Sequence, residues 1–82
     1  MTDALGNLGI NMKVRYDHSV DAAYINLAEG SESTSFGFTY ACDPGEVGGQ
    51  IHLDFDAMGR LIGIEVLQAS KMLPASLLAD HS

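Results

Sequence analysis

Residues 50–70, QIHLDFDAMGRLIGIEVLQAS, decide the fold of this chain. Apolar and polar side chains alternate over 51–56 and again over 61–67, which is the period of two typical of half-buried strands. An Asp-x-x-Gly sequence at 56–59 separates the two runs and favours a tight turn. The stretch therefore predicts a β-hairpin at the centre of the fold.

The pairing register of this hairpin follows from its apolar residues, because a slip of one residue moves a whole set of side chains to the other face. A three-residue loop would split the apolar set between both faces. A four-residue loop at 56–59 pairs Leu53 with Ile62 and keeps the set on one face, so we predict this register. A two-residue turn at Met58–Gly59 keeps the same faces and is the alternative.

Three residues are predicted to shape turns. Asp56 opens the hairpin turn by accepting hydrogen bonds from the amides ahead of it, and Gly59 closes the turn with a positive φ. Asp17 has the same role in an earlier turn. Together with His18 and Asp21 it could chelate a cation, but turn formation explains the two acids more simply.

Further strands are indicated by alternation at 12–16, 22–27 and 34–40, and Gly37 marks a bulge in the last of them. After residue 66 the apolar spacing becomes that of a helix. These elements predict an α+β class: a small antiparallel sheet of four to five strands, built on two hairpins, with a short C-terminal helix.

Two alternatives remain for the C-terminal helix. Ser70 is predicted to cap a helix whose first turn begins at Lys71. Pro74 is comfortable only in a first turn, so it complicates a single helix. Either one short helix begins near there, or a turn at 68–73 precedes a second one.

The chain has 82 residues, of which 46% are hydrophobic and 18% charged, as expected of one globular domain. We assign residues 1–11 to a flexible N-terminal extension and 12–82 to the domain, with Met12 as an alternative start. A domain this small buries only roughly 60–65% of its unfolded surface. Cys42 is the only cysteine and no Cys/His cluster offers a zinc site, so we expect a homodimer or higher oligomer.

The net charge is −7, and the four cations are scattered along the chain. Nucleic-acid binding needs clustered cations, so we expect none, whereas an acidic surface suits a basic protein partner. No run approaches the ~18 apolar residues of a membrane span. The first eleven residues lack a secretory signal, so we expect a cytoplasmic protein with no membrane contact.

A candidate site lies on the outer face of the predicted hairpin, where His52, Asp54 and Glu65 gather. A metal would need three such ligands to converge, and a general base would need His52 oriented by a carboxylate. In the predicted register, however, Gln50 and not His52 lies opposite Glu65. We therefore predict no catalytic residue, no metal and no cofactor, and keep these three residues as the alternative.

Glu65 is an acid within an otherwise apolar strand. It could be a charge that protects an edge strand from unwanted pairing. It could also be an anchor that bonds backbone amides, the partner subunit's Arg15 or the partner's Arg60. We favour an interface formed by Glu65, Leu61 and Leu67, because both faces of the sheet carry apolar residues and one short helix covers only one face.

Four segments carry a family pattern: Lys13–Asp17, Asp21–Leu27, Leu53–Arg60 and Gly63–Ser70. In these segments the chain resembles the DUF2283 family of small bacterial and archaeal proteins of unknown function, although its region 36–50 is longer and richer in Gly. The resemblance implies a small β-rich α+β fold and no established activity. Members often look like one half of a two-gene pair beside a small RNase-type toxin, which implies an antitoxin-like or adaptor role.

We therefore predict a small non-enzymatic protein-interaction module, antitoxin-like, that acts as a homo-oligomer and meets a basic protein partner. The alternative is a small metal-binding protein or enzyme that uses His52, Asp54 and Glu65. A third hypothesis is an oligomeric scaffold with no partner beyond itself.

Overall fold

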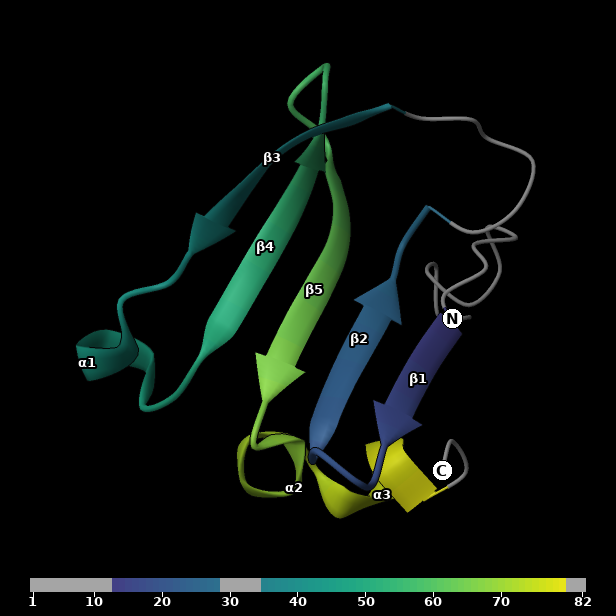
Figure 1. Ribbon diagram of the computed structural model, residues 1–82, viewed down its shortest axis with the longest axis vertical. Coiled ribbons are helices and arrows are strands. Elements are labelled where there is room, and N and C mark those ends of the chain that lie inside the picture. The colour runs from purple at the N-terminus through teal and green to yellow at the C-terminus, as the bar shows by residue number, and fades with distance from the viewer. Residues whose placement is uncertain (1–12, 29–34, 80–82) are drawn as a thin grey trace, which may run out of the picture.

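A computed structural model of the chain describes residues 13–28 and 35–79. Five antiparallel strands form one sheet in the order β1-β2-β5-β4-β3 (Figure 1). The strands are β1 (Lys13–Asp17), β2 (Ala22–Asn26), β3 (Phe36–Ala41), β4 (Ile51–Asp56) and β5 (Leu61–Leu67). The helices are α1 (Pro44–Val47), α2 (Ala69–Met72) and α3 (Ala75–Ala79). The predicted α+β class is confirmed, while the extension at 1–11 and the alternative start at Met12 lie outside the described residues.

The central hairpin, β4 and β5, has the predicted faces but not the predicted register. Leu53 pairs with Ile64, so the predicted pairing with Ile62 is wrong, and the register of the two-residue alternative holds along the strands. At the tip, the Asp56 amide donates to the Arg60 carbonyl at 2.8 Å, which leaves a three-residue loop. A register shift between Asp54 and Phe55 makes Ile62 an extra residue, and this bulge restores the faces that the loop alone would have split.

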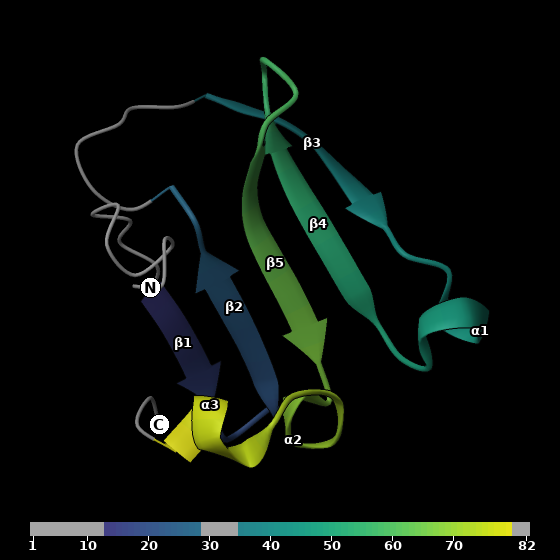
Figure 2. The same ribbon diagram turned by 180° about the vertical axis from the view of Figure 1, so that it is seen from behind.

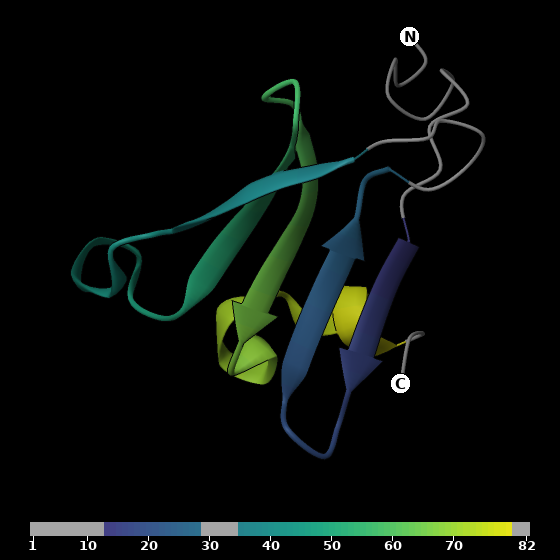
Figure 3. The ribbon, with the colours of Figure 1, turned by 45° about the horizontal axis from the view of Figure 1, so that its top comes forward.

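The core lies on one face of the sheet, beneath α2 and α3. Its buried residues are Ala23 and Val66 from the sheet with Ala69 and Leu78 from the helices. Both helices lie against the end of the sheet formed by β1, β2 and β5, as Figures 2 and 3 show. We call this side the helix face and the opposite side the polar face.

The C-terminal segment forms two short helices rather than one, because Pro74 separates α2 from α3. The prediction that Ser70 caps a helix beginning at Lys71 is wrong, since α2 begins at Ala69 and Ser70 lies inside it. The cap comes instead from Asp21, which accepts hydrogen bonds from the Ser70 amide (3.0 Å) and hydroxyl (2.7 Å). Asp21 thus satisfies two orphan donors of a helix 49 residues away, the Ser70 amide through its carboxylate and the Ala69 amide through its backbone carbonyl.

Strand β3 is one edge of the sheet, and β1 is the other. The predicted bulge at Gly37 is confirmed by a shift in register between Phe36 and Phe38. A Cβ at Gly37 would overlap the backbone of Asp56, so only glycine allows this close approach. After β3 the chain makes the single helical turn α1, which Asp43 caps by accepting a hydrogen bond from the Gly45 amide at 2.9 Å.

Candidate functional site

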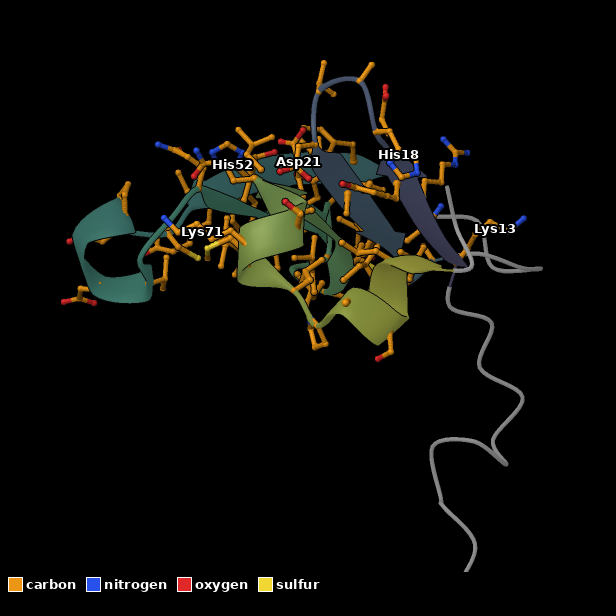
Figure 4. The ribbon with its side chains drawn as sticks, turned by 90° about the horizontal axis from the view of Figure 1, so that it is seen from below. Lys13, His18, Asp21, His52 and Lys71 are labelled. Atoms are coloured by element: carbon orange, nitrogen blue, oxygen red, sulfur yellow. The ribbon has the colours of Figure 1, made fainter. Side chains whose placement is uncertain are left out.

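Two surfaces of the sheet are candidates for function, and the first is the polar face. In Figure 4, α2 and α3 lie on one side of the sheet, and His52 and His18 point to the other. Cross-strand pairing places Tyr24 beside Glu65 and Glu65 beside His52. The same face carries Asp54, which pairs with Thr39 on β3.

His52 and Glu65 form a direct pair on this face. Their Nδ1 and Oε1 atoms lie 2.9 Å apart, and because an ionised carboxylate only accepts, the ring donates from Nδ1. The predicted placement of Gln50 opposite Glu65 is therefore wrong, since the true register is shifted by two residues. Both side chains remain partly exposed, at 27% and 46%. The pair is an interaction at the surface and contributes little to stability.

Asp54 belongs to a second, separate network. It accepts hydrogen bonds from the Thr39 hydroxyl at 2.6 Å and from the Tyr24 hydroxyl at 2.9 Å. Tyr24 reaches Asp54 by lying over Gly63, where a Cβ would overlap the phenol oxygen. Burial, the hydrogen bond to Asp54 and the negative charges of Asp54 and Glu65 together raise the pKa of Tyr24 to about 12. Tyr24 is therefore a hydrogen-bond donor at all physiological pH values.

The three residues of the alternative metal or enzyme site are thus divided between two networks. Within residues 13–28 and 35–79, no group of three His, Cys, Asp or Glu side chains is placed to hold a metal ion. A shallow hollow does lie at the β1–β2 end of the polar face, lined by Arg15, Asp17, His18, Ala22, Tyr24 and Glu65 among others. His52 and Asp54 do not line it. The geometry accordingly gives no support to a joint catalytic or metal-binding role for the three residues.

The proposed interface residues Glu65, Leu61 and Leu67 do not share one face. The bulge at Ile62 places Leu61 opposite Phe55, on the helix face, whereas Glu65 stays on the polar face. Because β5 lies between β2 and β4, the interpretation of Glu65 as an edge-strand charge is wrong. Its hydrogen bond goes to the His52 side chain rather than to a backbone amide. Leu67 is half-buried at the end of β5, opposite Ala22.

The carboxylate of Asp56 is occupied by hydrogen bonds within the β4–β5 turn. Asp56 is only 2% exposed and accepts from the Met58 amide at 2.9 Å, the Arg60 amide at 2.8 Å and Arg60 Nε at 2.9 Å. The backbone hydrogen bond from Arg60 is the main cause that lowers the pKa of Asp56. Gly59 closes the turn with φ of +85°. These contacts give Asp56 and Gly59 the structural roles that the sequence predicts for them.

The acids of the first hairpin turn are also occupied by local contacts. Asp17 accepts from the Ser19 amide at 2.9 Å and the Ser19 hydroxyl at 2.6 Å. Asp21 accepts from the Tyr16 hydroxyl at 2.6 Å and caps α2, while His18 lies edge-on to Tyr16 with ring centroids 4.7 Å apart. The hydrogen bonds from Tyr16 and Ser70 lower the pKa of Asp21. Turn and cap formation therefore explain these acids without a bound cation.

The second candidate surface is apolar, and sequence reasoning did not single it out. We call Phe38, Tyr40 and Phe55 the aromatic surface, while Phe36 lies beyond the bulge at Gly37 and pairs with Asp56. Phe38 stacks on Phe55 with ring centroids 4.9 Å apart, and Tyr40 lies opposite Leu53, so this part of the surface is on the helix face. The three β3 rings are nevertheless 62%, 52% and 56% exposed, in chain order. The helices end before they reach it, because each has only four or five residues.

Comparison with known proteins identifies the class of this small antiparallel α+β domain. Residues 13–70 match the family described as protein of unknown function (DUF2283), and the chain belongs to that family. A comparison with curated proteins found no match, and neither did a comparison with solved structures. No helix in the described part of the chain is both long and apolar enough to cross a bilayer.

Proposed function

We propose that this protein is a non-enzymatic protein-interaction module and that it acts through its aromatic surface. The observation that carries the proposal is the exposure of Phe36, Phe38 and Tyr40 on a single edge strand. Scattered exposed apolar residues are normal, but Phe38 and Tyr40 lie on the same face of β3 beside Phe55, and exposed aromatic residues grouped in this way are typical of binding surfaces. The Phe38 ring packs against the sheet, since it stacks on Phe55 of the neighbouring strand.

The charges next to this surface indicate the chemistry of the partner. Strand β3 leads directly into α1, where Asp43 and Glu46 are exposed and no basic residue is present (Figure 1). Val47 on the same helix is 40% exposed and extends the apolar area. A partner that fits would offer apolar side chains flanked by Lys or Arg, because opposite charges at a rim guide association. A small basic protein, as the antitoxin-like hypothesis requires, meets this description.

The net charge of the whole chain also favours a basic partner, but only part of that charge lies in the described residues. Of the eleven acidic residues, seven lie in the described part together with all four cations, so this part carries a charge of −3 and the remaining acids supply −4. The described surface is therefore only mildly acidic. The two exposed acids at α1, Asp43 and Glu46, are a more specific signal for a basic partner than the net charge of −7.

Native mass spectrometry of protein purified gently from its own organism tests this function. We expect the wild-type chain in a complex with a small basic protein. The double variant Phe38→Ser, Tyr40→Ser should lose that complex while remaining folded. The matched control is Val20→Ser, which changes an apolar residue that is 65% exposed in the β1–β2 turn, at the opposite end of the strand order from β3. A complex that survives the loss of both rings would refute the role of the aromatic surface.

A further inference from the structure

Among residues 13–28 and 35–79, no strand pairs with the outer edge of β3, and this edge has a composition that the outer edge of β1 lacks. Its residues Phe36–Ala41 include no charge and no proline, and all six are exposed. The opposite edge, β1, carries Lys13, Arg15 and Asp17. Charges and prolines are the usual means by which an edge strand is protected from pairing with another chain. Only β3 is left without such protection among the two edges.

The direction of the unused backbone groups on β3 follows from its pairing with β4. The Cys42 amide donates to the Ile51 carbonyl at 2.9 Å, so the backbone groups of Cys42 face β4. In an antiparallel strand this direction alternates from residue to residue. Tyr40 and Phe38 therefore face β4 as well, and the N–H and C=O groups of Thr39 and Ala41 face outward.

We propose that β3 pairs antiparallel with β3 of a second copy of this chain, centred on Thr39, to give a continuous ten-stranded sheet. This proposal rests on the proposed function, because it names a second copy of the chain as one partner that binds through β3. In this register, Thr39 and the partner subunit's Thr39 exchange two backbone hydrogen bonds. Ala41 lies opposite the partner's Gly37, and Phe38 lies opposite the partner's Tyr40.

The side-chain pairs of this register are favourable. Phe38 and the partner's Tyr40 form a non-hydrogen-bonded pair, the type in which side chains approach most closely. Aromatic pairs of this kind are among those that stabilise antiparallel strands. No charged residue is placed opposite another within the paired strands. For two chains that each carry −7, a neutral strand is the place where they can meet without like-charge contact.

Symmetry favours a second copy over an open chain of copies. Antiparallel pairing of a strand with itself is isologous, so it uses the free edge of β3 in both copies and leaves only the charged β1 edges outside. The twofold axis is perpendicular to the sheet, which keeps both aromatic surfaces on the same side. The dimer would then offer one broad apolar surface between two pairs of helices, and a domain that is small by itself would gain a larger sheet.

The test is a substitution that removes the backbone N–H group of Thr39. Thr39→Pro removes the central outward donor of the edge but no bond to β4, since the Thr39 amide faces away from that strand. The matched control is Thr39→Val, which keeps the amide and, like proline, loses the hydroxyl bond to Asp54. Sedimentation equilibrium should show that Thr39→Pro raises the dimer dissociation constant on the order of 30-fold, from two lost bonds, and that Thr39→Val changes it by less than about threefold.

A second measurement on the wild-type chain covers the case in which the proline variant does not fold. The Thr39 amide should become protected from hydrogen exchange as protein concentration rises, because it faces away from β4 and bonds the partner subunit in the proposed dimer. A Thr39 amide that stays unprotected at every concentration, or a folded Thr39→Pro variant that dimerises as the wild type does, would overturn the pairing. The function proposed above would survive either result if the Phe38→Ser, Tyr40→Ser variant still lost its partner.

Discussion

At the scale of single residues, the most informative contacts are those of buried or shielded polar groups. Asp56 lies almost fully buried in the β4–β5 turn and accepts three hydrogen bonds. Its lowered pKa means that the folded state binds a proton less readily than the unfolded state does. The stability that Asp56 contributes is therefore fully present above the unfolded value, near 3.8, and is lost as pH falls through the folded pKa.

Replacement of Asp56 by Asn should reduce stability at neutral pH and flatten its dependence on pH. Chemical denaturation at a series of pH values below about 5 measures the slope, to which one carboxylate contributes at most one proton. Asn keeps the size of the side chain but can no longer pair as an anion with Arg60 Nε. An unchanged slope in the variant would show that Asp56 does not carry this part of the acid sensitivity.

Tyr24 gives a second prediction at this scale. Burial is the main cause that raises the pKa of Tyr24 to about 12, and the bond to Asp54 comes second. Gly63→Ala forces the phenol away from its place over Gly63, so it should return the pKa toward 10, whereas Asp54→Asn should lower it less. Ultraviolet titration of tyrosinate measures both, and Tyr24→Phe identifies the signal. A larger effect from Asp54→Asn would reverse the order of the two causes.

At the scale of elements, the sequence predicted the strands well because alternation is a local signal. Alternating residues over 51–56 and 61–67 indicated both strands of the central hairpin, and Gly37 indicated the bulge in β3. The register failed because it depends on Ile62, an apolar residue that nothing local marks as the extra residue of a bulge. That shift of two residues also hid the contact between His52 and Glu65.

Contacts between distant segments were beyond the reach of the sequence pattern. Asp21 looked like an ordinary turn residue, and Ser70 looked like a cap for its own helix. In the fold, Asp21 caps α2 across 49 residues, which no spacing rule could show. The aromatic surface was missed for a related reason. The alternation of β3 was clear, but the short reach of α2 and α3 left its rings uncovered.

The docking of α3 provides a prediction about elements. Leu78 is 6% exposed and joins the core formed with Ala23, Val66 and Ala69. Leu78→Ala should lower the free energy of unfolding by about 2–4 kcal/mol, because it removes buried apolar volume from a small core. The control Leu61→Ala, at a side chain 38% exposed, should cost clearly less in the same urea titration. Equal costs would mean that α3 does not pack on the sheet as described.

At the scale of the whole molecule, the two faces of the sheet differ in how many of their side chains contact other described parts of the chain. On the polar face, Tyr24 and Thr39 donate to Asp54, and His52 forms a separate pair with Glu65. On the helix face, α2 and α3 cover the β1-β2-β5 end and leave Phe38 and Tyr40 exposed. Among the described residues, three of the seven exposed large apolar side chains lie on β3, and this is the observation behind the proposed interaction module.

The most direct test of this account is sedimentation equilibrium of the wild-type chain from about 1 μM to about 1 mM, compared with the Phe38→Ser, Tyr40→Ser variant. We expect a dimer of the wild-type chain that the variant loses, because the proposed pairing places Phe38 opposite Tyr40 of the partner subunit. A wild-type chain that remains monomeric over the whole range, or a variant that dimerises equally well, would contradict the proposed pairing of β3.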